Sequence, residues 1–192
     1  NNLVNVPMMT AKRTLGFARR NGHVALNIPY RGGELHFLIL LPDRVDGLAD
    51  LEKALTARSL ADCARLNPQE VILHLPKFKL EPPVMALGRE LQKLGMKSAF
   101  DQPRGSANFD RIAPRRPDDY LYISEVFHKT FLNLDEKGTE AAAATAVAMF
   151  AASAVMEKPK PIEVRVDRPF LFAIQHRASG ACLFLGHLRD PR

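Results

Sequence analysis

The sequence predicts an α+β fold in which mixed or antiparallel β-sheets are combined with a few helices. Three observations support this class. Apolar residues alternate at the strand period in "EVILHLPKFKLE", they recur at helical spacing in "GLADLEKALTARSLADCARL", and the chain has neither a βαβ rhythm nor a glycine-rich phosphate loop. With 192 residues, 46% of them hydrophobic, the chain is long enough to bury a substantial core.

The first predicted element is a β-hairpin in "VALNIPYRGGELHFLILLPD", with Gly32 and Gly33 at the turn. The second strand is continuously apolar from Leu38 to Leu41 and stops at Pro42, so we expect it to be deeply buried. The next segment predicts one or two amphipathic helices, broken near Ser59.

A long strand of a large sheet is expected over "EVILHLPKFKLE", interrupted at Pro76 and resuming at Phe78. The segment "PVMALGRELQKLGMKSAF" predicts a helix that ends at Gly95, a left-handed cap. A connecting loop follows in "QPRGSANFDRIAPRRPDD" because Pro, Gly, Asn and Asp are dense there. Further strands are predicted in "ISEVFHKTFLNLDEK", "PIEVRVDRPFLFAIQHR" and "ACLFLGHL".

Composition narrows the function classes. The 27 basic and 21 acidic residues give a formal charge of +6. The basic cluster "DRIAPRRPDD" is interleaved with acids, and neither it nor "AKRTLGFARR" has a pattern of stacking aromatics, which favours a solvated face over a polyanion or nucleic-acid site. No apolar run is long enough to predict a membrane span. Cys63 and Cys182 have no zinc-ligand spacing, and we expect both to be buried free thiols.

No catalytic, metal or cofactor constellation stands out. A triad of Ser153, His128 and Asp135 lacks the G-x-S-x-G elbow, and the six histidines match no metal-ligand pair. Strand or surface positions account for these histidines. The sequence therefore predicts a protein that is not an enzyme and has no metal site.

The unusual segment is "GTEAAAATAVAMFAASAVMEKP", an alanine-rich stretch placed between two strand patterns. As a helix, it would be apolar on every side from Ala141 to Ala152; a flexible linker is a further alternative. As a strand it divides into two faces of small residues, with Glu140 free to remain in water. Composition leaves these interpretations open.

Several motifs resemble the serpin family. "FLNLDEKGTEAAAATA" (131–146) is similar to the hinge of the serpin reactive-centre loop, and "VRVDRPFLFAI" (164–174) is similar to the family signature, including Asp167, Arg168, Pro169 and Phe170. The order and spacing of five further motifs also match: "VNVPMM", "LPD", "LHLPKFKLE", "LQKLGM" and "LFLGHLRDP". The resemblance covers residues 1–192 as the C-terminal portion of a single serpin domain, with hinge and loop at about 136–162, signature and C-terminal strands at 163–190, and the N-terminal helical half absent from this chain.

The resemblance implies a suicide inhibitor of serine proteases, with cysteine proteases as further candidates, and an extracellular, secreted location. The cleaved loop would insert into the large sheet as a strand, and about fourteen residues at ~3.3 Å each would span roughly 46 Å. Counting from the hinge glycine places the reactive bond between Ala152 and Ser153. The implied hinge consists of Gly138, Thr139, Glu140, Ala141, Ala142, Ala143, Ala144 and Thr145.

The same resemblance implies a target class. A small apolar residue at position 152 suits an elastase-like or subtilisin-like protease, whereas Met149, Phe150 or Met156 would suit a chymotrypsin-like one. The residues expected to contact the protease are Met149, Phe150, Ala151 and Ala154. Two alternatives remain: a non-inhibitory serpin-fold protein, and a truncated serpin without activity.

Overall fold

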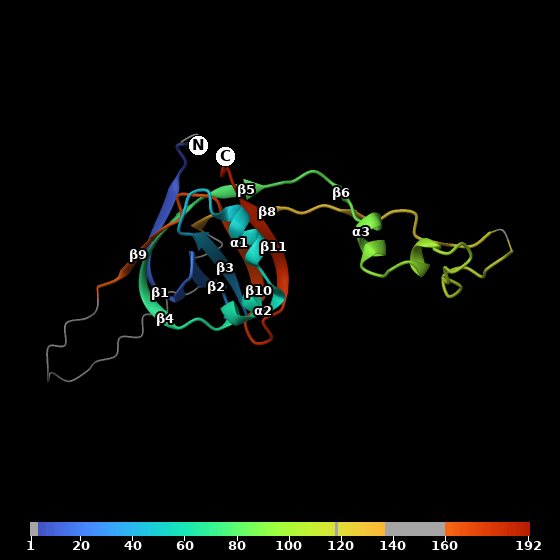
Figure 1. The fold of residues 1–192 in the computed structure, drawn as a ribbon, viewed down its shortest axis with the longest axis horizontal. Helices are drawn as coiled ribbons and strands as arrows, with labels where there is room; N and C mark the ends of the chain where they lie inside the picture. The colour runs from blue at the N-terminus through green and yellow to red at the C-terminus, as the bar shows by residue number, and fades with distance from the viewer. Residues whose placement is uncertain (1–3, 118, 137–159) are drawn as a thin grey trace. The chain divides into compact units, whose positions relative to one another are not determined.

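The computed structural model describes residues 4–117, 119–136 and 160–192 of the chain. They form two compact units (Figure 1): unit 1 comprises residues up to Lys79 and from Asn133 onward, and unit 2 comprises Leu80–Leu132. No helix among these residues is long and apolar enough to cross a membrane.

Unit 1 is built on a seven-stranded sheet whose strand order is β11-β10-β3-β2-β1-β4-β9. All neighbouring strands in it are antiparallel except β4 and β9, which are parallel. The strands are β1 (Met8–Arg20), β2 (His23–Pro29), β3 (Leu35–Pro42), β4 (Pro68–Pro76), β9 (Ile162–Arg165), β10 (Phe170–His176) and β11 (Cys182–Leu188). The α+β class with mixed and antiparallel sheets is confirmed.

The predicted hairpin is confirmed as β2 and β3, with both turn glycines at positive φ. The strand β3 is buried from His36 to Pro42, as its continuous apolar run predicted. The long strand β1 was not predicted from the sequence; its polar residues Thr10, Lys12 and Thr14 alternate along one exposed side.

Two short helices, α1 (Leu48–Ala54) and α2 (Ala57–Ala61), and the 3-10 turn η1 (Asp62–Ala64) cover one face of this sheet. The predicted break near Ser59 was wrong, because the helices separate at Leu55 and Thr56 instead. The Thr56 side chain accepts a hydrogen bond from the Ser59 backbone N–H at 3.0 Å, and the Ser59 hydroxyl accepts one from the Thr56 N–H at 2.9 Å. This capping box starts α2 and places Ser59 inside it.

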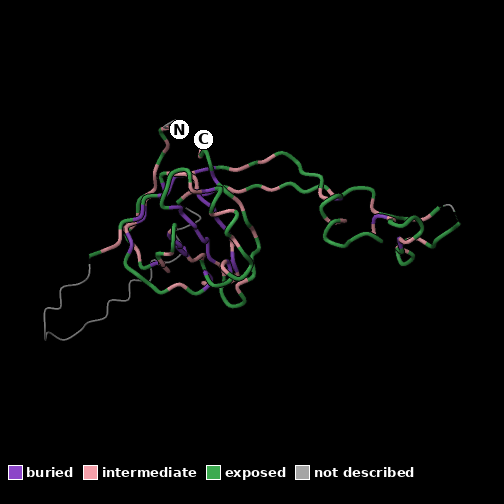
Figure 2. Tube along the Cα trace, in the orientation of Figure 1, coloured by how far each residue is buried: buried purple, intermediate pink, exposed green. Residues whose placement is uncertain are grey.

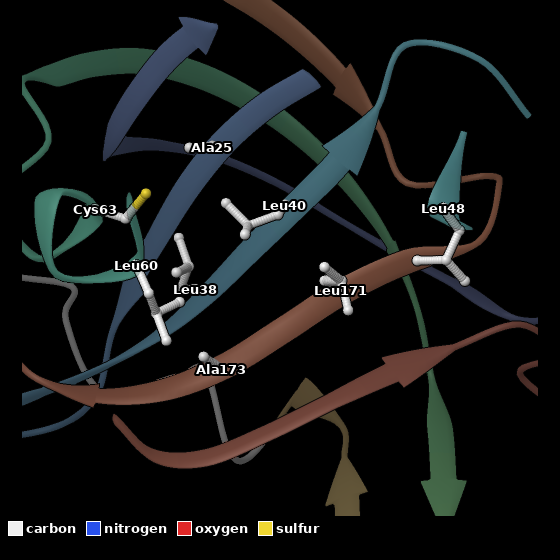
Figure 3. Packing of buried hydrophobic residues seen from close by; sticks show 8 residues of the cluster. All are labelled: Ala25, Leu38, Leu40, Leu48, Leu60, Cys63, Leu171 and Ala173. Atoms are coloured by element: carbon white, nitrogen blue, oxygen red, sulfur yellow. The ribbon is translucent and has the colours of Figure 1, made fainter. Parts of the chain in front are cut away.

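The core of unit 1 lies on both faces of the sheet. Figure 3 shows the helix-side cluster, which consists of Ala25, Leu38, Leu40, Leu48, Leu60, Cys63, Leu171 and Ala173. On the opposite face Phe172 stacks on Phe37, with ring centroids 5.4 Å apart, and on Phe184 at 6.1 Å. Because alternate residues of a strand point to opposite faces, the two clusters share the same strands.

The predicted long strand over residues 70–81 is divided in two. Its first part is β4, but β5 (Phe78–Leu80) leaves that sheet and pairs with β8 (Leu132–Leu134) in a sheet of two strands. Pro76 and Lys77 separate the two parts; Lys77 instead donates its backbone N–H to the Pro7 carbonyl at 3.0 Å. Proline cannot donate to a ladder, which explains why the pattern breaks there.

Unit 2 contains α3 (Gly88–Lys93), the 3-10 turn η2 (Ser98–Phe100) and the short antiparallel pair β6 (Met85–Ala86) and β7 (Phe127–His128). The predicted glycine cap is confirmed: Gly95 has φ +102°, and the Gly95 and Met96 N–H groups donate to Gln92 and Leu91. Within the strand predicted over residues 123–137, the described positions 123–136 form only the short strands β7 and β8. Most positions of unit 2 are exposed (Figure 2).

The predicted pair of buried thiols is half correct. Cys63 is buried in the helix-side core, whereas Cys182 is exposed. Cys182 begins β11, which lies at the edge of the sheet and has β10 as its one neighbour there. Free cysteines are usually buried, but Cys182 is exposed because an edge strand is covered on fewer sides than a central one.

Candidate functional site

The segment with the predicted function, residues 137–159, lies outside the described residues. This applies to the hinge from Gly138 to Thr145, the reactive bond Ala152–Ser153, and the protease-contacting residues Met149, Phe150, Ala151 and Ala154. These assignments stay predictions. The structure does describe the two elements to which the segment is attached and the family signature that follows it.

The N-terminal attachment is β8, which pairs with β5. Leu134 is buried at the end of β8. Two residues later, Glu136 forms an ion pair with Lys77, which immediately precedes β5. The hydrogen bond from Lys77 lowers the pKa of Glu136, so its carboxylate is ionised at neutral pH. The chain therefore enters the segment from a position held by a strand pair and by an ion pair.

The C-terminal attachment is β9, which pairs in parallel with β4 from Ile162 opposite Val71 to Arg165 opposite His74. The His74 Nε2–H donates to Glu163 Oε1 at 3.0 Å, which leaves Nδ1 to accept from Thr10 Oγ1 at 3.0 Å. Three adjacent strands are therefore joined by side chains on one face. These contacts were not predicted from the sequence, although His74 lies on the more polar face of its strand pattern.

The signature residues follow β9 and are held in the fold by Arg168. Its Nη1 donates to the Asp43 carbonyl oxygen at 2.7 Å, and its Nε donates to Asp167 Oδ1 at 3.0 Å. Charge-assisted hydrogen bonds of this kind are among the stronger polar contacts in proteins. The structure thus brings the signature next to Asp43 of the "LPD" motif, more than a hundred positions earlier in the chain.

Phe170 provides the apolar part of the same junction. Its ring is buried and meets Phe78 of the "LHLPKFKLE" motif edge to face, with centroids 6.1 Å apart. Such pairs contribute about 0.5–1.5 kcal/mol beyond the area that they bury. The ring of Phe78 also lies 6.0 Å from that of Phe172, so the signature is continuous with the aromatic core.

A cavity of about 470 Å³ lies where these motifs converge. Its walls come from the N-terminal "VNVPMM" motif, from the end of β4, from the signature and from the C-terminal "LFLGHLRDP" motif. They include Val4, Val6, Met8, Pro76, Arg165, Val166, Asp167, Arg168, Pro169, Phe170, Leu188, Arg189 and Pro191. The motifs that are spread over the sequence therefore form one structural junction at the base of the C-terminal attachment.

The histidines, cysteines and carboxylates form no metal centre in the part of the chain that the structure describes. No group of three or more His, Cys, Asp and Glu side chains in this part could hold a metal ion. All six histidines lie in strands, as the sequence analysis proposed. The polar contacts of His74 with Thr10 and Glu163 join neighbouring strands beside the C-terminal attachment.

The family motifs converge beside β9, the strand that follows residues 137–159. Comparison with known proteins identifies the class of protein to which this arrangement belongs. A family model described as "Serpin (serine protease inhibitor)" matches residues 1–191. The chain belongs to the serpin family, and the resemblance inferred from its motifs is confirmed.

Individual relatives agree with the family model. The chain is 39% identical over 171 residues to Serpin B10 of Mus musculus, a match that covers 88% of this chain and 41% of that protein. It is 39% identical over 173 residues to the leukocyte elastase inhibitor of Equus caballus, covering 86% and 43%.

Among solved structures, the thermophilic serpin tengpin in its native state aligns with a TM-score of 0.72 and 30% identity, over 96% of this chain and 46% of that one. The serpin fold of the chain is confirmed by this alignment. The chain spans less than half the length of each of these relatives.

Proposed function

We propose that this chain is the reactive-loop-bearing portion of a serine protease inhibitor that acts as a suicide substrate. The observation that carries the proposal is the family match over residues 1–191, which includes the alanine-rich segment and both of its attachments. The name of the relative from Equus caballus, leukocyte elastase inhibitor, supports a serine protease of the elastase type as the target.

The reaction begins as ordinary proteolysis. The nucleophilic serine of the protease attacks the carbonyl carbon of Ala152, the peptide bond to Ser153 breaks, and the Ser153 amine leaves with a proton. An ester then joins Ala152 to the protease. The chain itself supplies no catalytic group and is the substrate in this step, not an enzyme.

Trapping depends on the segment that precedes the reactive bond. Once the bond is cut, residues from Gly138 onward enter a sheet as a new strand, and their backbone N–H and C=O groups gain ladder hydrogen bonds. Small side chains from Ala141 to Thr145 enter without steric clash, because packed interiors tolerate little added volume. The acylated protease is carried with the strand and is held before deacylation.

The test is formation of a covalent complex that survives denaturing electrophoresis. We expect such a complex when the full chain is incubated with pancreatic elastase, subtilisin or chymotrypsin, and none with trypsin, because positions 138–157 contain no Lys or Arg. Mass spectrometry of the released C-terminal peptide should place the cut between residues 152 and 153. A cut outside 149–156 would contradict the assigned bond.

A hinge variant separates inhibition from simple cleavage. Ala143→Arg adds a large charged side chain to the inserting strand, so the variant should be cleaved at the same bond but should form at least about tenfold less complex. Ala57→Arg, at an exposed position of helix α2, is the matched control and should still form the complex.

The second candidate is a chain without inhibitory activity of its own. The match covers 41–46% of the length of these relatives, and this observation favours the second candidate. The strands that receive the loop would then lie in the part of a serpin domain that the match does not cover. Cleavage at residues 152 and 153 without any complex, in the parent chain as in Ala143→Arg, would support this candidate and contradict the first.

A further inference from the structure

A second large cavity, of about 520 Å³, lies in unit 1 between the sheet and its two covering helices. Its walls are the turn between β1 and β2, the end of β3, helix α1 and the start of α2. Its lining residues differ from those of the 470 Å³ cavity, although Asp43, whose backbone carbonyl accepts from Arg168 at the junction, lines it as well. Its volume falls within the range of about 300–1,000 Å³ that is usual for small-molecule sites.

One side of this cavity is apolar. Leu40 contributes from the sheet, and Leu51, Ala54 and Leu55 contribute from α1 and its C-terminal end. Cys63 completes this side; its thiol donates to the Ser59 carbonyl at 3.2 Å, and burial raises its pKa, so the group is protonated and uncharged at neutral pH. Figure 3 shows Cys63 and Leu40 within the helix-side core cluster. An apolar body therefore has a surface to pack against.

The opposite side is polar and carries Arg20, Asp43, Arg44 and Asp50, of which Asp43 and Arg44 have ion-pair partners. Arg44 is bound by Asp46, with Nη2 2.7 Å from Oδ2 and Nε 3.0 Å from Oδ1. Asp43 accepts from Arg19 at 3.4 Å. These side chains can stay as they are when a molecule enters the cavity.

Arg20 is different. Its Nη2 donates to the Asp62 carbonyl oxygen at 3.4 Å, and it forms no ion pair with a carboxylate of the described residues. Burial has the largest effect on the two titratable groups nearby: it lowers the pKa of His23 and raises the pKa of Cys63. The positive charge of Arg20 lowers the pKa of both groups. The cavity thus combines an apolar wall with one arginine that has no carboxylate bound to it.

We propose that this cavity binds a small amphipathic carboxylate, whose head group pairs with Arg20 while its apolar body packs against Leu40, Leu51, Leu55 and Cys63. A planar guanidinium matches a carboxylate in a two-point, charge-assisted contact. A neutral ligand of the same shape would forgo this contact. The site is separate from the proposed protease-trapping segment and does not depend on it.

The experiment titrates the full chain with 2-naphthoate and with its neutral isostere 2-naphthamide, by isothermal calorimetry at low salt. We expect saturable 1:1 binding of naphthoate and about tenfold weaker binding of naphthamide, because the charge-assisted hydrogen bonds are lost. Arg20→Gln should reduce naphthoate affinity about tenfold and make the two probes equal. Arg31→Gln, which removes an exposed arginine of the turn between β2 and β3 outside the cavity, is the matched control and should leave both affinities unchanged.

The cysteines locate the bound probe without relying on a variant of the cavity itself. In a Cys182→Ser chain, Cys63 is the single remaining thiol, and saturating naphthoate should slow its alkylation by N-ethylmaleimide at least about fivefold. Binding without protection of Cys63 would overturn the assigned site. Equal affinities for the two probes in the parent chain, or an Arg20→Gln variant that binds like the parent, would overturn the carboxylate assignment, and absence of saturable binding would overturn the proposal as a whole.

Discussion

The seven-stranded sheet of unit 1 and the strand pair of unit 2 both carry phenylalanine side chains, yet they bury them very differently. Phe172 in β10 is 1% exposed, whereas Phe127 in β7 is 71% exposed. In unit 1, each apolar face of the sheet meets other elements of the same unit. In unit 2 the described residues leave large side chains uncovered, among them Leu94, Ile112, Leu121, Tyr122, Phe127 and Phe131.

The apolar pattern of a strand therefore indicates which side chains could be buried, but it does not indicate whether another element of the fold covers them. A strand of two or three residues with one neighbour cannot enclose an aromatic ring, and an isolated strand pair is only marginally stable in water. The measurable consequence is that equivalent substitutions should have very unequal effects in the two units.

The largest effect is expected at the centre of the aromatic face. Phe172→Ala removes a ring that contacts Phe37, Phe78 and Phe184, and it should lower the free energy of unfolding by ~3–5 kcal/mol. Phe127→Ala, the matched change in unit 2, should stay within about 0.5 kcal/mol of the parent. Urea unfolding followed by far-ultraviolet circular dichroism measures both. Effects of equal size would contradict the comparison.

A smaller effect is expected for the polar contact that fastens the signature to unit 1. Arg168→Gln removes the donor to the Asp43 carbonyl, and the side chain is only 25% exposed, so a loss of ~1–3 kcal/mol is expected. Arg44→Gln breaks an exposed ion pair with Asp46 and should cost less than about 0.5 kcal/mol. The same urea titration compares them, and a loss at Arg44 as large as at Arg168 would show that burial is not the deciding factor.

The smallest effect concerns pH and a polar group inside unit 1. His36 is buried; its Nε2–H donates to Gln175 Oε1 at 3.1 Å, and the Gln175 amide donates to the Leu60 carbonyl at 2.9 Å. Burial lowers the pKa of His36 below its ordinary value of 6.5; the hydrogen bond to Gln175 partly opposes this shift, and the charge of Arg177 adds to it. The native state therefore binds fewer protons than the unfolded state in this range.

Because the folded pKa is depressed, the free energy of unfolding should be constant above about pH 6.5 and should fall as the pH drops through the region between the unfolded and folded pKa values. His36→Gln should make this fall shallower. It should not abolish it, because burial also lowers the pKa of His23. Thermal unfolding at half-unit intervals from pH 5 to 8 gives the slope, with His128→Gln in the exposed strand β7 as control. An unchanged slope in His36→Gln would contradict the assignment.

Much of the fold could be predicted from local patterns. The hairpin turn at Gly32 and Gly33, the burial of β3 and the cap at Gly95 each depend on residues that are close in sequence, so their signals were strong. The failures occurred where distant residues decided the outcome. The strand expected over residues 70–81 divides at Pro76 because β5 finds its partner in β8, and the exposure of Cys182 follows from the edge position of β11.

The candidate site divides in the same way. Its motifs, including Asp167, Arg168, Pro169 and Phe170, were recognisable as serpin motifs in the sequence, and the family match confirms that membership. Their contacts were not predictable. The pairing of Arg168 with Asp43 and the link from Thr10 through His74 to Glu163 join residues separated by more than sixty positions.

The sequence by itself determined the family, the α+β class and the small-residue character of residues 138–154, because motif order, periodicity and composition are properties of the chain alone. Only the tertiary structure decided which faces are covered, which thiol is buried, and that Arg20 lies beside an apolar cavity with no carboxylate of the described residues bound to it. The physical reason is that burial and charge pairing depend on distances between strands, and these distances are set by the whole sheet and not by neighbours in the sequence.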